Sequence, residues 1–430
     1  MSLPTTCSGE AIESSEKAVR QPGRLANHLR IILFTTFIYG LFLSSFASWV
    51  TDHNKVSVLE KRPYAAFPHL KLSPESIRAF PAGFEAFFSD RFPLRLQMVA
   101  LSNLVKWKVF GVSGSDKVLV GKDDWLFYLD GGNTEFLRHD KMEIDKLKIF
   151  VSMFESRRAW LARHHIKYLL VFVPCKCEMY RDKVPERFKI QNGLSMQDQL
   201  VEALRRYSGV QVIDLRQHIL SEKKRLGMPL YLESDSHWNQ LGAFVAYQSV
   251  VDYLAKIFPA IKPVNWGDVK IAFVQQCGGD LAGMLGLRDQ TSETAIRVEN
   301  EHRTWALSAN PAPPDLDNPT QFFHPFATEV PDVHLPKAYF IRDSFTINMQ
   351  PFLSEHFRRA FYHWNYFRKA DDDFLPEEIL KEKPDIVIQE MAENLIARDV
   401  IPNPNQLETT SPDPFCLSSN AVLSEKIKTE

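Results

Sequence analysis

Beyond Gly111 the chain alternates short β-branched runs with longer segments of helical periodicity, and this alternation constrains the fold more than any other feature. The runs expected to form strands are 117–120, 166–173, 210–215, 337–341 and 384–388. The segments expected to form helices are 142–164, 194–207 and 240–257. Strands that alternate with helices indicate an α/β fold with a largely parallel sheet flanked by helices. Sites in such sheets lie beyond the carboxyl ends of strands, so the residues that follow these runs are the first functional candidates.

An uncharged, apolar stretch near the start of the chain, Ile31–Val50, is long enough to cross a bilayer. A cleaved signal peptide would need a shorter apolar core and a small-residue exit, whereas this stretch ends beside Trp49, a residue type that anchors at membrane interfaces. The preceding basic residues are Lys17, Arg20, Arg24 and Arg30. By the positive-inside rule we expect residues 1–30 to form a cytoplasmic tail, 31–50 one N-terminal transmembrane helix, and the rest to be exported.

The remainder of the chain divides by its pattern. Between 51 and 110, apolar residues recur at helical spacing, as in Phe80, Phe84, Phe87 and Phe88, which predicts a helical linker. Residues 111–400 are expected to form the main domain, with a long loop over the Pro-, Asn- and Asp-rich segment 300–330. Residues 401–430 are expected to form an irregular tail.

Composition excludes some classes of function. Hydrophobic residues make up 45% of the chain, which is normal for a folded protein with a sizeable core. The 51 basic and 53 acidic residues give a formal net charge of -2, so the chain lacks the basic excess that binds nucleic acid. The five cysteines include no CxxC pair, and the one-residue spacing of Cys175 and Cys177 is tight for a zinc motif. We therefore predict no metal site and no cofactor.

One chemical candidate follows the expected strand 337–341. Ser344, in the sequence Arg342-Asp343-Ser344-Phe345, precedes an apolar stretch of helical character. A serine at a strand-to-helix turn projects its hydroxyl into the cleft, and its own backbone N–H can bind a developing oxyanion. A second oxyanion donor could come from Arg342, Asn348 or Gly279. The alternative is that Ser344 caps the following helix.

Asp235 and His237 form the second candidate. If the segment is extended, its two-residue period places both side chains on one face. The Asp235 carboxylate could then orient the His237 imidazole, which would accept the proton of a serine hydroxyl. The alternative is that Asp235 caps the following helix and His237 is a surface residue. Trp238 could stack on a sugar ring or pack in the core.

Several stretches resemble, in order, the SGNH-hydrolase-like domain of the AlgX/AlgJ family of alginate O-acetylation proteins. These stretches are FEAFFSDRFPLR from 84, VKWKVFG from 105, VLVGKDDWLFY from 118, VPCKCEMYRDKVP from 173, DSHWNQLGAFVAY from 235, GGDLAGML from 278 and RDSF from 342. The resemblance covers about residues 80–395. In the family an Asp-x-His pair and a serine after a later strand form the catalytic triad, which implies Asp235, His237 and Ser344 here.

The resemblance implies an O-acetyltransferase that passes an acetyl group through an acyl-serine to hydroxyls of an exported polysaccharide. A membrane-bound partner protein would donate the acetyl group, and the domain would lie in the periplasm, held to the bacterial inner membrane by the chain's own anchor. The same triad would also serve a carbohydrate acetylesterase, with water as the acceptor. A third alternative is a non-catalytic component that binds polysaccharide during assembly.

Overall fold

The computed structural model describes the residues 28–40, 56–57, 62–63, 65–69, 72–90, 92, 95–129, 141–188, 194–300, 307–309, 323–364 and 374–396. The chain divides into two compact units, Met1–Met98 and Val99–Glu430. The predicted irregular tail lies outside the described residues. The predicted loop over 300–330 is wrong for the strands Leu307–Ala309 and Phe326–Glu329, and most of the rest of that segment lies outside the described residues.

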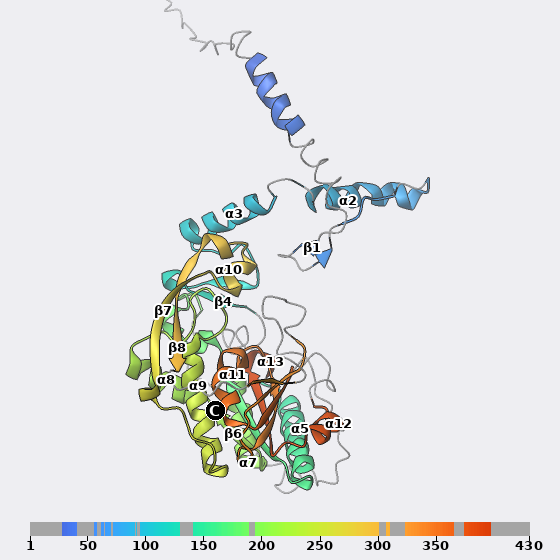
Figure 1. Ribbon diagram of the computed structural model, residues 1–430. Helices are drawn as coiled ribbons and strands as arrows, with labels where there is room; N and C mark the ends of the chain where they lie inside the picture. Colours follow the sequence, from blue (N-terminus) through green and yellow to red (C-terminus); the bar gives the residue numbers. More distant parts are fainter. Residues whose placement is uncertain are drawn as a thin grey trace, which may run out of the picture. The chain divides into compact units, whose positions relative to one another are not determined.

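A mixed sheet forms the centre of the second unit (Figure 1). In the described part of the chain it has seven strands in the order β6-β5-β13-β11-β12-β10-β9. Their bounds are β5 Lys167–Val173, β6 Gln211–Asp214, β9 Leu307–Ala309, β10 Phe326–Glu329, β11 Lys337–Arg342, β12 Arg359–Trp364 and β13 Ile386–Ala392. The first five strands in this order run parallel, whereas β10 and β9 add an antiparallel edge. The predicted largely parallel sheet is confirmed, and the antiparallel edge is an addition to it.

Helices cover both faces of the sheet because its central strands are apolar on both sides. In β5, Leu169, Val171 and Val173 pack on one face, and Tyr168, Leu170 and Phe172 pack on the other. The first face is covered by α8 (Arg216–Leu226), α9 (Gln240–Ile257) and α11 (Thr346–Leu353). The second is covered by α5 (Ile144–Arg163), α7 (Met196–Tyr207), α12 (Pro376–Glu382) and α13 (Glu393–Ile396). The three predicted helices are confirmed as α5, α7 and α9.

Smaller elements pack beside this core. Two antiparallel hairpins pair β3 (Val118–Val120) with β4 (Leu126–Tyr128) and β7 (Val269–Cys277) with β8 (Ser292–Asn300). Two short helices, α6 (Lys176–Met179) and α10 (Asp280–Met284), follow β5 and β7. A third apolar cluster joins Trp107 of α3 (Arg95–Phe110) to β3, β4 and α10. The predicted strand 117–120 is therefore confirmed, but it pairs in a hairpin outside the main sheet.

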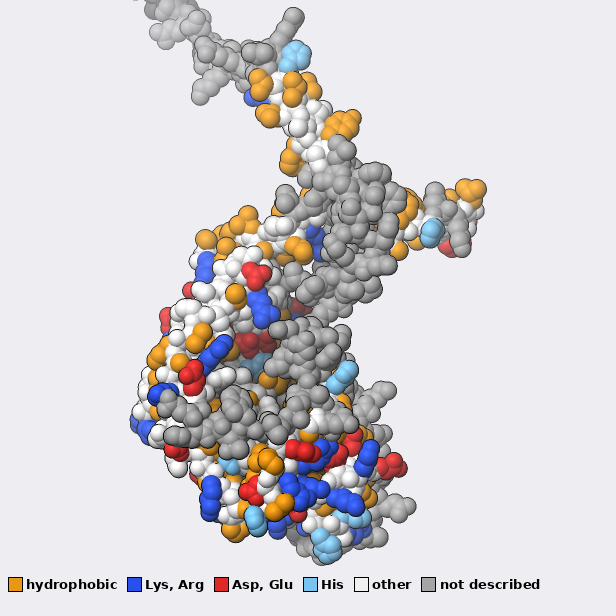
Figure 2. All heavy atoms as spheres, in the orientation of Figure 1, with side chains coloured by type: hydrophobic (Ala, Val, Ile, Leu, Met, Phe, Trp, Pro, Cys, Tyr) orange, Lys and Arg blue, Asp and Glu red, His pale blue; other side chains and the backbone are white. Residues whose placement is uncertain are grey.

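The outer surface carries mixed side chains. On the face shown in Figure 2, basic and acidic side chains are intermixed, in keeping with the near balance of charge. Exposed hydrophobic side chains line α3, including Leu101, Val105, Val109 and Phe110. The buried residues of the same helix are Ala100, Asn103 and Trp107, and helical spacing places Leu101, Val105 and Val109 on the opposite side.

The first unit contains a helix over residues 28–40, a hairpin of β1 (Val56–Ser57) and β2 (Arg62–Pro63), and α2 (Pro74–Asp90). Phe67 packs against the α2 residues Phe80, Phe84 and Phe87, which confirms the amphipathic helix predicted from their spacing. Within the described residues, no helix has the length and apolar character needed to cross a membrane. The second half of the predicted span, 41–50, lies outside those residues.

Candidate active site

Three side chains from distant parts of the sequence meet beyond the carboxyl end of β11. The His237 Nε2 atom lies 2.7 Å from the Ser344 Oγ atom, and its Nδ1 atom lies 2.7 Å from Asp235 Oδ1. Because a carboxylate only accepts hydrogen bonds, Nδ1 carries a proton. In the neutral imidazole Nε2 then accepts the hydroxyl of Ser344, whereas in the charged imidazolium Nε2 donates to it. Ser344 and His237 are both half-buried. The structure thus brings together the three residues that the sequence singled out.

The side chain of Asp343 holds the turn that carries Ser344. The Asp343 carboxylate accepts the N–H of Phe345 at 2.8 Å and, with its other oxygen, the N–H of Ala392 at 2.8 Å. The N–H of Asp343 donates to Glu390 Oε2 at 2.9 Å. Burial, together with the nearby charge of Asp343, raises the pKa of Glu390 well above its usual value. These bonds fasten the turn to the neighbouring strand β13.

Ser344 does not cap the helix that follows it. The residue at the N-cap of α11 is Phe345, and no side chain caps that end. The alternative reading of Ser344 as a helix cap is therefore wrong, because its hydroxyl points instead to His237.

The Asp235–His237 segment is bent rather than extended. Asp235 Oδ1 accepts both the backbone N–H of His237, at 2.9 Å, and its ring N–H, so the carboxylate folds back on the residue two positions later. The other oxygen, Oδ2, accepts the N–H of Asp280 at 2.9 Å. The cap of α9 is Asn239, whose side chain accepts the N–H of Gly242. The alternative in which Asp235 caps α9 is therefore wrong.

The electrostatics of the pair favour a charged, hydrogen-bonded His237. Burial alone would lower the pKa of His237, but the hydrogen bond and the charge of Asp235 outweigh it and raise this pKa to about 9, with help from Asp280 and Asp343. Burial would likewise raise the pKa of Asp235, yet the hydrogen bond and charge of His237 and the N–H of Asp280 hold it well below its usual range. The two groups therefore act as one hydrogen-bonded unit.

A further carboxylate, Asp280, lies beside this pair and was missed from the sequence. Asp280 Oδ2 accepts the hydroxyl of Ser236 at 2.5 Å and lies 3.7 Å from His237 Nδ1. Burial and the charge of Asp235 raise the pKa of Asp280. Its neighbour Gly279 packs so closely that an added Cβ would lie 2.4 Å from the Asp235 Cβ. The Gly-Gly-Asp of GGDLAGML was the available signal, because adjacent glycines permit a close backbone approach.

Lys176 supports the same loop from the other side and was also missed. Its buried ammonium donates to the carbonyl oxygens of Leu126 at 2.7 Å, Glu233 at 2.8 Å and Asp235 at 2.8 Å. These three bonds use its full set of donors. Burial lowers the pKa of Lys176 to about 8, against the opposing charges of Asp235 and its acidic neighbours. Lys176 thus joins β4 to the carbonyl groups of Glu233 and Asp235 in the loop that carries His237.

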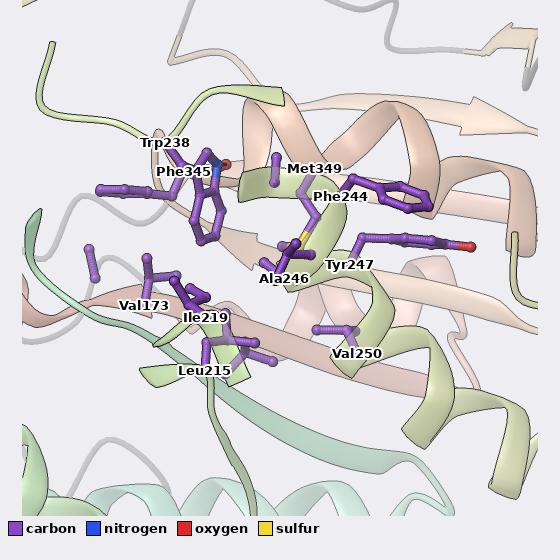
Figure 3. Close-up of a cluster of buried hydrophobic side chains, with 14 of the residues drawn as sticks. Val173, Leu215, Ile219, Trp238, Phe244, Ala246, Tyr247, Val250, Phe345 and Met349 are labelled. Atoms are coloured by element: carbon purple, nitrogen blue, oxygen red, sulfur yellow. Dashed lines mark hydrogen bonds between the residues drawn. The ribbon is translucent and has the colours of Figure 1, made fainter. Parts of the chain in front are cut away.

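Trp238 and Phe345, which directly follow His237 and Ser344 in the sequence, belong to a cluster of buried apolar side chains (Figure 3). Trp238 is fully buried, and its indole N–H donates to the carbonyl oxygen of Phe345 at 3.1 Å. The Phe345 ring packs edge-on against Trp238 and lies 4.8 Å from the His237 ring. Trp238 is therefore a core residue, and its burial rules out the alternative of stacking on a sugar. It links the serine turn to the histidine loop.

The predicted oxyanion donors differ in whether their N–H groups already have hydrogen-bond partners. The hydrogen bonds among the described residues leave the backbone N–H of Ser344 available. The N–H of Gly279 donates to Ser234 Oγ at 2.8 Å, and the guanidinium of Arg342 is buried over two aromatic rings. Asn348 is half-buried, and its amide donates a long bond of 3.3 Å to a backbone carbonyl. Of the three proposed second donors, Asn348 lies in α11, four residues after Ser344, and remains partly exposed.

Two groups of side chains in the described chain have the residue types and the spacing to hold a metal ion. They are Asp235, His237 and Asp280, and separately Cys175, Glu178 and Glu393. In the first group each side chain already has a hydrogen-bond partner: His237 bonds to Asp235, Asp235 also accepts the N–H of Asp280, and Asp280 accepts the hydroxyl of Ser236. That geometry serves proton transfer rather than metal binding.

Sequence comparison identifies the family. Residues 118–393 match the family described as the SGNH hydrolase-like domain of the acetyltransferase AlgX. The chain belongs to this family. The match includes the serine turn, the histidine loop, Lys176 and Asp280, and it confirms the SGNH-hydrolase-like α/β fold expected from the sequence motifs.

Individual relatives are more distant. The probable alginate O-acetylase AlgJ of Pseudomonas syringae pv. tomato is 25% identical over 175 residues, which cover 41% of this chain and 42% of the relative. The protein of the same name from Pseudomonas putida is 24% identical over 212 residues, which cover 47% and 50%. The chain thus spans about half the length of the curated relatives that it matches.

Solved structures also resemble this SGNH-hydrolase-like chain. The O-acetyltransferase domain of Pseudomonas putida AlgJ aligns with a TM-score of 0.41 and 14% identity, over 73% of this chain and 99% of that domain. Bacillus cereus PatB1 aligns with a TM-score of 0.48 and 15% identity, over 66% and 98%.

Proposed function

We propose that the protein is an extracytoplasmic O-acetyltransferase that moves an acetyl group through an acyl-serine to hydroxyls of an exported polysaccharide. The observation that carries this proposal is the pair of 2.7 Å contacts that joins Ser344, His237 and Asp235. A serine hydroxyl is a poor nucleophile by itself, and an oriented imidazole is the base that activates it. Membership of the AlgX family supports acetyl transfer as the reaction.

The proposed reaction has two half-steps. In the first, Ser344 Oγ attacks the acetyl carbonyl while its proton passes to His237 Nε2, and the donor's leaving group departs with that proton. In the second, a sugar hydroxyl gives its proton to His237 and attacks the acetyl-serine, so that the ester moves to the sugar and Ser344 is restored. Asp235 remains ionised and stabilises the imidazolium in both half-steps.

The acceptor is proposed to be a polysaccharide because both curated relatives carry the name probable alginate O-acetylase. The uncharged stretch 31–50 and the basic residues before it support a single-pass anchor in the bacterial inner membrane, with the catalytic unit in the periplasm. Acetyl donors are made inside the cell, so a membrane-bound partner protein would have to deliver the acetyl group across the membrane.

The second candidate is an acetylesterase, because the same triad can transfer the acetyl group to water instead of a sugar hydroxyl. The experiment that separates the two uses the purified chain, 4-nitrophenyl acetate as donor, and uronic-acid oligosaccharides as acceptors. If the protein is a transferase, mass spectrometry should detect acetylated oligosaccharide. Nitrophenol should also be released faster when the acceptor is added. Free acetate as the product at every acceptor concentration would instead establish an esterase.

A non-catalytic binding component makes a different prediction in the same assay. It would bind the oligosaccharide, yet it would release nitrophenol no faster than the Ser344→Ala variant. That result would contradict both enzymatic candidates, because the variant lacks the proposed nucleophile.

A further inference from the structure

A second cluster of polar side chains lies at the carboxyl edge of the same sheet, and the proposed reaction does not use it. Cys175 follows β5, Cys177 and Glu178 lie in α6, and Glu393 begins α13 directly after β13. Because β5 and β13 are adjacent parallel strands, their carboxyl ends meet. Ligand atoms of Cys175, Glu178 and Glu393 lie within 4.8 Å of one another, and the two sulfurs are 3.1 Å apart.

All four side chains are almost fully buried, with exposed fractions between 0% and 6%. Thiols at such depth are usually surrounded by apolar side chains, and buried carboxylates are usually paired. Here two thiols and two carboxyl groups share one pocket of the interior. Such a concentration of ionisable ligands needs a positive partner.

The buried cation beside the cluster is already engaged. The guanidinium of Arg216 pairs with Glu178 at 3.1 Å, Asp198 at 2.7 Å and Asp214 at 2.9 Å. Glu393 also lies within its electrostatic reach. Arg216 therefore contacts the cluster through Glu178 Oε1, and its other bonds go to Asp198 and Asp214.

The two carboxylate oxygens of Glu178 differ in their contacts. Its Oε1 atom accepts the Arg216 bond and lies 3.5 Å from the partly exposed Arg181 guanidinium. Its Oε2 atom is buried and has no hydrogen-bond partner among the described residues. A buried carboxylate oxygen left without a donor is costly, whereas a coordinated cation would satisfy it.

We propose that Cys175, Cys177, Glu178 and Glu393 form a structural site for a zinc ion. Zn²⁺ is four-coordinate and accepts both thiolate sulfur and carboxylate oxygen as ligands, whereas Mg²⁺ and Ca²⁺ select oxygen ligands. Cys175, Glu178 and Glu393 already lie close enough to share an ion, and Cys177 would complete the set by turning its side chain toward them. Two sulfurs on one zinc lie about 3.8 Å apart for Zn–S bonds of about 2.3 Å, so the thiols separate slightly, by side-chain rotation, when they lose their protons and bind.

The sequence led us to expect no metal here because a one-residue cysteine spacing is too tight for the usual zinc motifs. The fold changes this expectation, since Glu178 follows Cys177 in the same helix and Glu393 comes from the start of α13, directly after the adjacent strand β13. The ion would tie the ends of β5 and β13 together. β13 also holds the serine turn through the N–H of Ala392, so the ion would stiffen the base of the active site without touching the reacting atoms.

The test uses the purified full-length chain in detergent, kept reduced by a phosphine and stripped of metal with a chelator. Added Zn²⁺ should bind at one equivalent and raise the melting temperature by several degrees at saturation. Co²⁺ in place of zinc should give the near-ultraviolet sulfur-to-cobalt absorption that marks thiolate ligation. Absence of stoichiometric binding, or of that absorption, would overturn the proposal.

Matched variants locate the ion. Cys175→Ser should abolish the cobalt–sulfur absorption, and Glu178→Gln, which keeps the size of the side chain, should weaken zinc binding at least about 10-fold. Cys277→Ser changes an exposed thiol in β7, and His237→Ala removes the other candidate ligand set. Both should bind zinc as the unmodified chain does. Unchanged binding in Glu178→Gln and Cys175→Ser, or loss of binding in His237→Ala, would show that the metal binds elsewhere.

Discussion

The substitution Gly279→Ala tests the position of Asp235, because it displaces this carboxylate without changing any side chain of the triad. The added Cβ would lie 2.4 Å from the Asp235 Cβ and 2.6 Å from its Oδ2. Carbon atoms in contact are about 3.5–4.0 Å apart, so Asp235 must shift by about 1 Å. The φ of Gly279 is -76°, a value that alanine adopts freely, so the effect is steric. A displacement of about 1 Å in a catalytic group can cost about 100-fold in rate, and we expect that loss in kcat/KM.

The assay is the initial rate of 4-nitrophenyl acetate cleavage, with a thermal melt of each variant to verify folding. Gly283→Ala is the matched control, because it lies in the same helix, α10, with no atom within 4 Å of the added Cβ. That control should keep its activity and melt at or slightly above the temperature of the unmodified chain. Full activity in Gly279→Ala, or an equal loss in both variants, would refute the role assigned to Asp235.

Three further predictions concern the same site and the anchor. Lys176→Met removes an ammonium bound to three carbonyls, so kcat/KM for the ester should fall about 100-fold in a folded variant, and normal activity would deny Lys176 a positioning role. The rate should rise with pH as His237 loses its proton near its pKa of about 9. Asp235→Asn should move this rise to lower pH and reduce the maximal rate about 10⁴-fold, and a profile that keeps its midpoint would contradict the pairing. A reporter enzyme fused after Val50 should be active only outside the cytoplasm, and cytoplasmic activity would remove the anchor.

The raised pKa of His237 also predicts the pH dependence of stability. Its usual value of 6.5 applies to the unfolded chain, and about 9 applies to the folded protein. The stabilisation from this group is therefore complete below about pH 6.5 and is lost as the pH rises through about 9. Denaturant midpoints measured across this window should fall more for the unmodified chain than for His237→Ala, and parallel curves would contradict the shift.

The sequence predicted the central strands of the main sheet correctly because their apolar residues are buried on both faces. β5, β11 and β13 read as continuous β-branched or aromatic runs, because helices cover both sides of each. β12, with the sequence Arg-Ala-Phe-Tyr-His-Trp, was missed because its polar residues hide that pattern. The pairing of β3 with β4 instead of the main sheet depends on tertiary contacts, which propensity does not report.

The candidate site shows a similar division. Strand position pointed to Ser344, and the two-residue spacing pointed to Asp235 and His237. Their meeting across 107 residues could be anticipated only through the family motifs. Lys176 carried no such signal, because it binds three backbone carbonyls. The only signal for Asp280 was the pair of glycines before it, because it binds the N–H and hydroxyl of Ser236. A single polar residue that binds backbone leaves no periodicity or spacing to recognise.

The most direct test of the proposed mechanism is the site of acetylation. The purified chain is incubated with excess 4-nitrophenyl acetate, quenched in acid, and analysed by intact mass and peptide mapping. The account predicts one added acetyl group, on Ser344, that chases onto an added oligosaccharide or water. Ser344→Ala should remain folded, acquire no acetyl group and lose several orders of magnitude in turnover. Acetylation at another residue, or full turnover in a folded Ser344→Ala protein, would contradict the assignment of Ser344 as the nucleophile.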